Sequence, residues 1–176
     1  MQMLIVRVMF LKFLYIDPLE CTGCRICEMV CSFHWDKVLN PRKARLRVIR
    51  VEAGLDILIA CRNCAKPKCM EICPENAIRK VESTGLVVVD EKKCTGCTAC
   101  IEACPFGAIY MHPDKNVAIK CVLCGTCVKY CPVGTLRIIS PEELAQYNAT
   151  RYIKKIKATF LEDLKIPEDA KKEEDS

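Results

Sequence analysis

Short apolar runs broken by turn residues dominate the chain. Along residues 45–51, hydrophobic and basic positions alternate, and a turn containing Gly54 separates this run from residues 56–60. A period of two that stops at Gly, Pro or Asn is typical of antiparallel strands joined by short turns. The sequence predicts three such hairpins, formed by residues 45–51 with 56–60, 77–81 with 86–90, and 108–111 with 117–120.

The longest apolar stretch covers residues 1–16, and Arg7 and Lys12 interrupt it. These charges make it too short and too polar to span a bilayer. It also lacks the cleavage site of a signal peptide and a twin-arginine pair. We therefore predict an edge strand here without membrane insertion, and a strand that binds a partner is the alternative.

The C-terminal part predicts a strand followed by a helix. Residues 133–139 are rich in β-branched and apolar side chains and should form a closing strand. Ser140 and Pro141 place a capping residue before a proline at the first helical position, so a helix is expected over residues 141–164. The charged residues 165–176 are expected to be disordered.

Cysteine spacing adds a candidate chemistry to this pattern. Sixteen of the 176 residues are cysteines, and they fall into four groups of four, called motifs 1 to 4 below. Motifs 1, 3 and 4 share the spacing CxxCxxCxxxC, and motif 2 has two extra residues in its second gap. In sequence order the motifs are Cys21, Cys24, Cys27 and Cys31; Cys61, Cys64, Cys69 and Cys73; Cys94, Cys97, Cys100 and Cys104; and Cys121, Cys124, Cys127 and Cys131.

This spacing is that of bacterial ferredoxins, in which three close thiolates hold one cubane cluster and the fourth reaches another. Structural zinc favours paired CxxC units, often with histidine, and the chain has only two histidines. A disulfide scaffold would not repeat one ligand spacing four times. We therefore predict four 4Fe–4S clusters that use all sixteen cysteines.

The predicted clusters change what the composition implies. Cysteine is counted within the hydrophobic share of 51%, so the remaining apolar core is modest. Folding is then expected to require the clusters, with a largely disordered apo chain. Four oxidised clusters of charge about −2 each would change the formal net charge from +5 to about −3. This balance does not favour nucleic-acid binding, and oxygen-sensitive clusters without an export signal predict a cytoplasmic protein.

Two features favour a nested pairing of the motifs. Residues 73–97 contain a proline turn, two predicted strands and the start of motif 3, which is nearly a complete ferredoxin. A short helix is expected before the fourth cysteine of each motif. In motifs 2, 3 and 4 a proline directly follows that cysteine, whereas in motif 1 the following residue is Ser32. The helix of motif 1 should therefore continue through Phe33 and Trp35. If motifs 2 and 3 pair, motifs 1 and 4 pair around them. Tandem pairing, of motif 1 with 2 and of motif 3 with 4, is the alternative.

Nested pairing predicts the cluster ligands and two units. The inserted unit would span residues 61–104, and the outer unit would combine residues 11–60 and 105–140. The four ligand sets would be Cys61, Cys64, Cys69 and Cys104; Cys94, Cys97, Cys100 and Cys73; Cys21, Cys24, Cys27 and Cys131; and Cys121, Cys124, Cys127 and Cys31.

Residues 37–50 contain six basic side chains and no acidic one. They could form a surface that attracts a partner, or the polar face of a hairpin near negative clusters. The glycines inside the cluster loops are expected to adopt positive φ angles and to bring N–H groups to the sulfurs. These glycines are Gly23, Gly96 and Gly125.

Residues 11–140 resemble the four-cluster iron–sulfur subunits of molybdenum and tungsten oxidoreductases, a family that includes subunits of formate dehydrogenases, hydrogenase-linked complexes and dimethyl sulfoxide reductase. The resemblance is carried by CTGCRICEMVCS, CRNCAKPKCMEICP, CTGCTACIEACPFGAI and CVLCGTCVKYCPVG. The family's nested pairing and widened motif 2 imply an α+β fold of two ferredoxin-like units, one nested in the other, with short antiparallel hairpins and a C-terminal helix. Larger members of the family often carry a long insertion in motif 4 or a C-terminal membrane anchor, and this sequence shows neither. The resemblance therefore fits the small subunit of a tungsten aldehyde oxidoreductase well.

The resemblance implies an electron relay. We find no nucleophile–base constellation, phosphate loop or dinucleotide fingerprint, so the chain is not expected to be an enzyme on its own. A large molybdenum- or tungsten-pterin subunit would oxidise an aldehyde or formate, and the clusters would pass electrons to ferredoxin or another acceptor. A freestanding polyferredoxin, a subunit of a hydrogenase-linked complex and a zinc-bound interaction protein are the alternatives.

Overall fold

Short strands and short helices make up the chain, which this computed structural model describes over residues 12–52 and 55–150. One unit extends to Ser140 and a second begins at Pro141. The strands are β1 (Phe13–Ile16), β2 (Arg47–Glu52), β3 (Leu55–Ile59), β4 (Ile78–Lys80), β5 (Val87–Val89), β6 (Ile109–Met111), β7 (Ala118–Lys120) and β8 (Leu136–Ile139). The helices of the first unit are α2 (Ile26–Asp36), α3 (Lys68–Glu71), α4 (Ala99–Glu102), α5 (Thr126–Lys129) and the 3₁₀ turn η1 (Pro41–Lys43).

The three predicted hairpins are confirmed, and the described residues have the mixed α and β character that the sequence predicted. β2 pairs with β3, β4 with β5 and β6 with β7, each in the antiparallel sense. In the second hairpin, Gly85 has a φ of 70° and its amide donates to the carbonyl of Val81 at 2.8 Å, which closes the turn. The turn around Gly54 lies outside the described residues.

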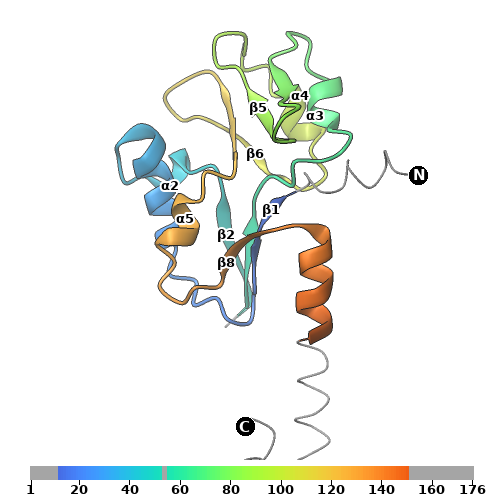
Figure 1. The fold of residues 1–176 in the computed structure, drawn as a ribbon. Coiled ribbons are helices and arrows are strands. Elements are labelled where there is room, and N and C mark those ends of the chain that lie inside the picture. Colours follow the sequence, from blue (N-terminus) through green and yellow to red (C-terminus); the bar gives the residue numbers. More distant parts are fainter. Residues whose placement is uncertain (1–11, 53–54, 151–176) are drawn as a thin grey trace, which may run out of the picture. The chain divides into compact units, whose positions relative to one another are not determined.

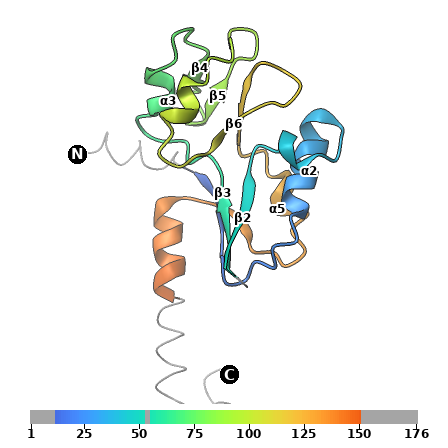
Figure 2. The same ribbon diagram turned by 180° about the vertical axis from the view of Figure 1, so that it is seen from behind.

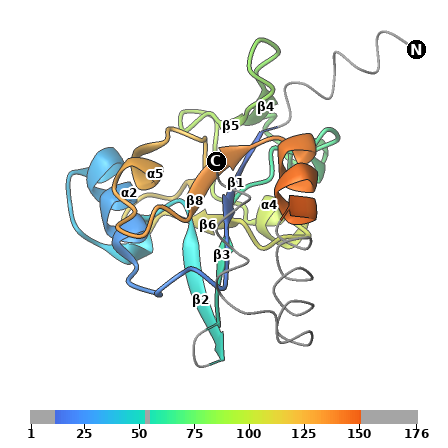
Figure 3. The ribbon, with the colours of Figure 1, turned by 60° about the horizontal axis from the view of Figure 1, so that its bottom comes forward.

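β1 and β8 join the two ends of the first unit. They pair in the antiparallel sense, with Phe13 opposite Ile139, and lie side by side in Figure 3. Directly after β1, the buried amide of Asp17 donates to the hydroxyl of Thr135 at 3.1 Å. The strands predicted near the N-terminus and at residues 133–139 are therefore both present, and they are each other's partners. Residues 1–11 lie outside the described part.

The helices pack in two pairs. α2 contacts α5, and α3 contacts α4; the pairs lie at different places in the unit, as Figures 1 and 2 show. α2 continues past Cys31 to Asp36, as predicted from the absence of a proline after motif 1. The other helices have only four residues each. Since such short helices are unstable alone, they depend on what packs around them.

Cysteine side chains form part of both apolar clusters. The first cluster combines side chains such as Leu14 and Leu46 with five buried cysteines, and the second combines Ile78, Val87 and Ile109 with one. Thiols therefore occupy places that larger apolar side chains fill in other small domains. This agrees with the modest apolar core expected from composition.

The basic segment at residues 37–50 is largely used inside the unit. Arg47 donates to the carbonyl of Leu46 at 2.9 Å and stacks on Tyr110 at 4.3 Å. Lys43 pairs with Asp114 at 2.5 Å, and Arg50 pairs with Asp56 at 3.0 Å. These contacts favour the hairpin interpretation of this segment over a free basic surface.

In the second unit, residues 141–150 are helical. This confirms the predicted C-terminal helix over its first ten residues. Residues 151–164 of the predicted helix, and the tail at 165–176, lie outside the described part. Across the described residues, every helix falls short of the length and apolar character needed to cross a bilayer.

Candidate metal centres

The structure gathers the sixteen cysteines into four cavities, with four cysteines lining each. The cavities have similar volumes, of about 310, 320, 350 and 350 Å³ for A, B, C and D. Cavity A is lined by Cys21, Cys24, Cys27 and Cys131; cavity B by Cys31, Cys121, Cys124 and Cys127; cavity C by Cys61, Cys64, Cys69 and Cys104; and cavity D by Cys73, Cys94, Cys97 and Cys100. Each cavity thus combines three cysteines of one motif with the fourth of another, in the sets expected from nested pairing.

Helices α2 and α5 connect cavities A and B. Cys27 and Cys31 are four residues apart on α2, so they lie about 6 Å apart along the helix. Cys27 lines cavity A and Cys31 lines cavity B. At α5 the order is reversed, because Cys127 lines cavity B and Cys131 lines cavity A. This exchange of fourth cysteines makes A and B neighbours.

The same exchange connects cavities C and D through α3 and α4. Cys69 and Cys104 line cavity C, whereas Cys73 and Cys100 line cavity D. Cys121 of cavity B and Cys61 of cavity C belong to the first apolar cluster and lie close enough to interact electrostatically. These contacts link A to B, B to C and C to D, and we describe the four cavities as a row in that order.

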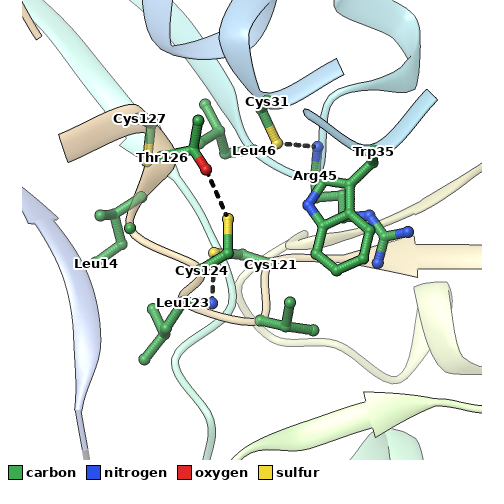
Figure 4. Close-up of a pocket in the computed structure, with 12 residues that line it drawn as sticks. Leu14, Cys31, Trp35, Arg45, Leu46, Cys121, Leu123, Cys124, Thr126 and Cys127 are labelled. Atoms are coloured by element: carbon green, nitrogen blue, oxygen red, sulfur yellow. Dashed lines mark hydrogen bonds between the residues drawn. The ribbon is translucent and has the colours of Figure 1, made fainter. Parts of the chain in front are cut away.

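Backbone amides point at the sulfurs from several loops. Figure 4 shows cavity B, where the amide of Arg45 donates to Cys31 at 3.3 Å and the amide of Leu123 donates to Cys121 at 3.5 Å. Such N–H groups stabilise the negative charge of a thiolate. Five similar bonds, at 3.3–3.4 Å, run from Gly23 to Cys21, Asn63 to Cys61, Ala77 to Cys73, Ala118 to Cys94 and Ala108 to Cys104.

A left-handed residue recurs two positions after the first cysteine of every motif. Its φ is 65° at Gly23, 47° at Asn63, 73° at Gly96 and 55° at Leu123. In three of these loops this conformation turns the residue's own amide toward the first sulfur. The positive φ predicted for the loop glycines is confirmed, including 79° at Gly125. Sequence reasoning missed the non-glycine positions.

Asn63 does more than make a turn. It is 1% exposed, and its Oδ1 accepts from the amide of Val87 at 3.1 Å. Its own amide donates to Cys61. Asn63 therefore fastens motif 2 to strand β5. The signal available in the sequence was its residue type, because asparagine adopts positive φ more readily than most residues.

The chemistry of the cavities fits a thiolate-bound cofactor. None of the sixteen cysteines, all of which lie in the described residues, forms a disulfide. Thirteen of them are buried or half-buried, and Cys24, Cys97 and Cys124 are exposed. Within residues 12–52 and 55–150, no three Cys, His, Asp or Glu side chains converge as ligands of a single ion do. The four sulfurs of each cavity surround an open space instead. Four thiols with amide donors are the donor set that binds a 4Fe–4S cluster.

Burial disfavours the ionised thiols. It raises the pKa of Cys27 and Cys121 to about 12, and that of Cys69 and Cys100 to about 11. Burial also raises the pKa of Cys127, and neighbouring sulfurs add to the shift. In the absence of metal these thiols are protonated at neutral pH, so iron has to displace their protons.

Cluster loading should therefore strengthen as pH rises. A thiol whose pKa is about 11 or 12 must lose its proton to bind iron, and protons compete with iron at every lower pH. We expect more iron to be retained at about pH 8.5 than at about pH 6.5 in an anaerobic chelator challenge, with chelator strength matched at the two values. Equal or greater retention at the lower pH would contradict this account.

Gly23 and Gly134 offer a matched test of the cluster loops. Both have a φ of 65°, so alanine introduces similar backbone strain at each. A Cβ at Gly23 would overlap the paired side chains of Arg50 and Asp56, whereas a Cβ at Gly134 meets nothing within 4 Å. We expect Gly134→Ala to cost about 1 kcal/mol and Gly23→Ala clearly more, with iron lost from cavity A. Thermal unfolding and iron analysis of the loaded variants measure both effects, and equal behaviour would show that the overlap is unimportant.

Comparisons with known proteins agree with this geometry. Residues 57–140 match the 4Fe–4S dicluster domain, and residues 18–33 match a 4Fe–4S binding domain. The protein is 41% identical over 90 residues to the polyferredoxin-like subunit of aliphatic sulfonate oxidoreductase from Pyrococcus furiosus, covering 51% of its own length and 52% of that subunit. It is 36% identical over 109 residues to the B subunit of anaerobic dimethyl sulfoxide reductase from Escherichia coli, covering 53% and 52%.

A third relative is the thiosulfate reductase electron transfer subunit PhsB of Salmonella typhi, at 30% identity over 111 residues, covering 59% of the present protein and 57% of PhsB. The chain thus spans about half the length of these curated relatives. Among solved structures, a subunit of the active site complex BamBC of benzoyl coenzyme A reductase with zinc gives a TM-score of 0.42 at 23% identity, covering 87% of the present protein and 96% of that subunit. The protein is therefore similar to 4Fe–4S dicluster domains over residues 57–140, and its relatives are subunits of oxidoreductases, one of them an electron transfer subunit by name.

Proposed function

We propose that this protein is an electron-transfer subunit that holds one 4Fe–4S cluster in each of cavities A, B, C and D. It would relay single electrons between a molybdenum or tungsten catalytic subunit and ferredoxin or another acceptor. The observation that carries the proposal is the row of four cavities, each lined by four cysteines. When bound, a 4Fe–4S cluster supplies reversible one-electron chemistry.

The protein's own residues would hold, insulate and tune these groups. Buried thiols such as Cys27 and Cys127 exclude water from one side of their cavities. Backbone amides donate to the sulfurs and stabilise negative charge there. Cavities A, B and D each include one exposed cysteine, namely Cys24, Cys124 and Cys97, whereas cavity C has none. Partners that deliver and remove electrons would approach cavities A and D, the two ends of the row.

Nested pairing of the motifs is part of the proposal. Motifs 1 and 4 would form an outer unit from residues 11–60 and 105–140, and motifs 2 and 3 an inserted unit from residues 61–104. The packing of α2 with α5 and of α3 with α4 supports this division. So does the pairing of β1 with β8, which brings the outer segments together.

The names of the relatives support a catalytic partner that is an oxidoreductase, because they are subunits of a sulfonate oxidoreductase, a dimethyl sulfoxide reductase and a thiosulfate reductase. The resemblance of the cysteine motifs to iron–sulfur subunits of molybdenum and tungsten oxidoreductases is the reason to expect one of these metals in that partner. Oxidation of a substrate such as an aldehyde to an acid by that partner takes one oxygen atom from water and releases two electrons and two protons. The relay subunit would accept the two electrons one at a time and pass them to two one-electron acceptors, so that it is unchanged after each cycle. We place this complex in the cytoplasm, where a reducing environment keeps thiols available to bind iron.

Iron counting separates nested from tandem pairing. Under nested pairing, Cys31 and Cys121 bind the same cluster, so Cys31→Ala, Cys121→Ala and the double variant should each lose about four irons. Under tandem pairing, the two residues serve different clusters, and the double variant should lose about eight. Iron and sulfide analysis of anaerobically purified protein measures this. Cys21→Ala combined with Cys121→Ala is the control, because those residues line different cavities and their losses should add.

The partner proposal is tested by tagging the protein in its native host and purifying it without oxygen. We expect a larger subunit to co-elute in a fixed ratio, with molybdenum or tungsten found by metal analysis. Addition of that subunit's substrate should reduce the clusters, seen as bleaching of their visible absorption, and added ferredoxin should reoxidise them. A protein that elutes alone, without either metal, would instead be a freestanding carrier.

A further inference from the structure

Lys120 is a buried cation at the centre of the first unit. It ends strand β7, immediately before Cys121, and is only 1% exposed. Its Nζ donates to the carbonyl of Val87 and to that of Cys121, the latter at 3.4 Å. A lysine is seldom buried to this extent unless its charge has a partner. The two carbonyl oxygens accept hydrogen bonds from the ammonium group, but they do not neutralise its charge.

The position of Lys120 relates its charge to the two central cavities. Val87 lines cavity C, and Cys121 lines cavity B. The Nζ of Lys120 contacts the backbone of both residues, so the ammonium lies between these cavities. Val87, which accepts from the Nζ of Lys120, is part of the wall of cavity C, so the ammonium adjoins this cavity.

A second cation adjoins cavity B. Arg45 stacks on the ring of Trp35 at 3.9 Å, and its side chain is only 14% exposed. Figure 4 shows both residues beside Cys31 at the cavity wall. Glu91 approaches the guanidinium at 3.6 Å, and the buried Nε of Arg45 has no hydrogen-bond partner among the described residues. The central cavities B and C are therefore both flanked by buried or half-buried positive charge.

Cavity A has the opposite charge beside it. Glu28 follows Cys27 on α2 and is 3% exposed. Its Oε1 accepts from the amide of Val48 at 2.7 Å, and within the described residues it forms no ion pair. Val48, whose amide donates to Glu28, and Cys27 both line cavity A, so the carboxylate lies beside this cavity. Two other buried acids lie near this cavity: Asp56 is paired with Arg50, and Asp17 precedes the loop of Cys21, whose amide donates to the Asp17 carbonyl at 3.1 Å.

We propose that Lys120 and Glu28 set the order of the reduction potentials along the row, making the sites in cavities B and C the easiest to reduce and the site in cavity A harder. This inference rests on the proposed function. Reduction adds one negative charge to a site, which a buried cation stabilises and a buried carboxylate opposes. An electron that enters at cavity A or D would then reside at the sites in cavities B and C, and its transfer from there to the site in cavity A would be unfavourable in free energy.

The test is a redox titration of the loaded protein, followed by electron paramagnetic resonance. We expect four one-electron steps. Lys120→Met keeps the side-chain length while removing the charge, so two of the four steps should move to more negative potentials. At a fixed potential between the original and shifted midpoints, the ratio of reduced to oxidised cluster at those sites should fall about tenfold. Lys120→Arg, which restores the charge, should return both steps toward their original positions.

Lys66→Met is the matched control. Lys66 lies between Cys64 and Cys69 in the loop of cavity C, but it is exposed, so solvent screens its charge. The same formal charge is removed, and we expect little movement of any step.

Glu28→Gln is an independent test, because the glutamine can still accept from the amide of Val48 while the negative charge of Glu28 is lost. One step should move to a more positive potential.

Iron content is measured before each titration. The inference would be overturned if all four clusters are present and their potentials shift no more in Lys120→Met and Glu28→Gln than in Lys66→Met. That outcome would leave the proposed function standing. If Lys120→Met does not load, Glu28→Gln decides: an unmoved step overturns the inference, and a positive shift supports it. A wild-type protein that holds no cubanes would overturn the proposed function and this inference together.

Discussion

The close approach of four thiols in each cavity is the constraint on which the rest of the structure depends. Thiolates repel one another, and removal from water disfavours their ionised form, as the raised pKa of Cys27 and Cys121 shows. A cofactor that carries positive iron offsets both costs. Without such a group, the protein would hold protonated thiols around open space at the positions where a small domain needs its core.

The other local features serve these thiols. Three helices of four residues contain one cysteine each, and they are too short to be stable without support from the groups that pack around them. In three of the four motifs a left-handed residue turns its amide toward the first sulfur, and at Leu123 this conformation strains the backbone. Strands β1 and β8 pair with each other and contribute side chains to the walls of cavities A and B. Stability and redox function thus depend on the same contacts.

Much of the fold followed from local patterns. Apolar alternation predicted the hairpins, and Ser32 in place of proline predicted the continuation of α2, because these features act through neighbouring residues. Features that depend on distant partners were harder to predict. The basic residues at 37–50 offered two interpretations, and only the contacts of Arg47 and Lys43 favour one. The sequence showed Lys120 next to motif 4, but its burial follows from the packing of β7 beside β5.

Native mass spectrometry of the anaerobically purified protein counts the iron and sulfide that the sixteen thiols hold. We expect a single dominant species whose added mass equals four Fe₄S₄ units, in a compact charge-state distribution, and an expanded distribution once the iron is removed. A compact species that carries zinc, or none of these units, would contradict this expectation.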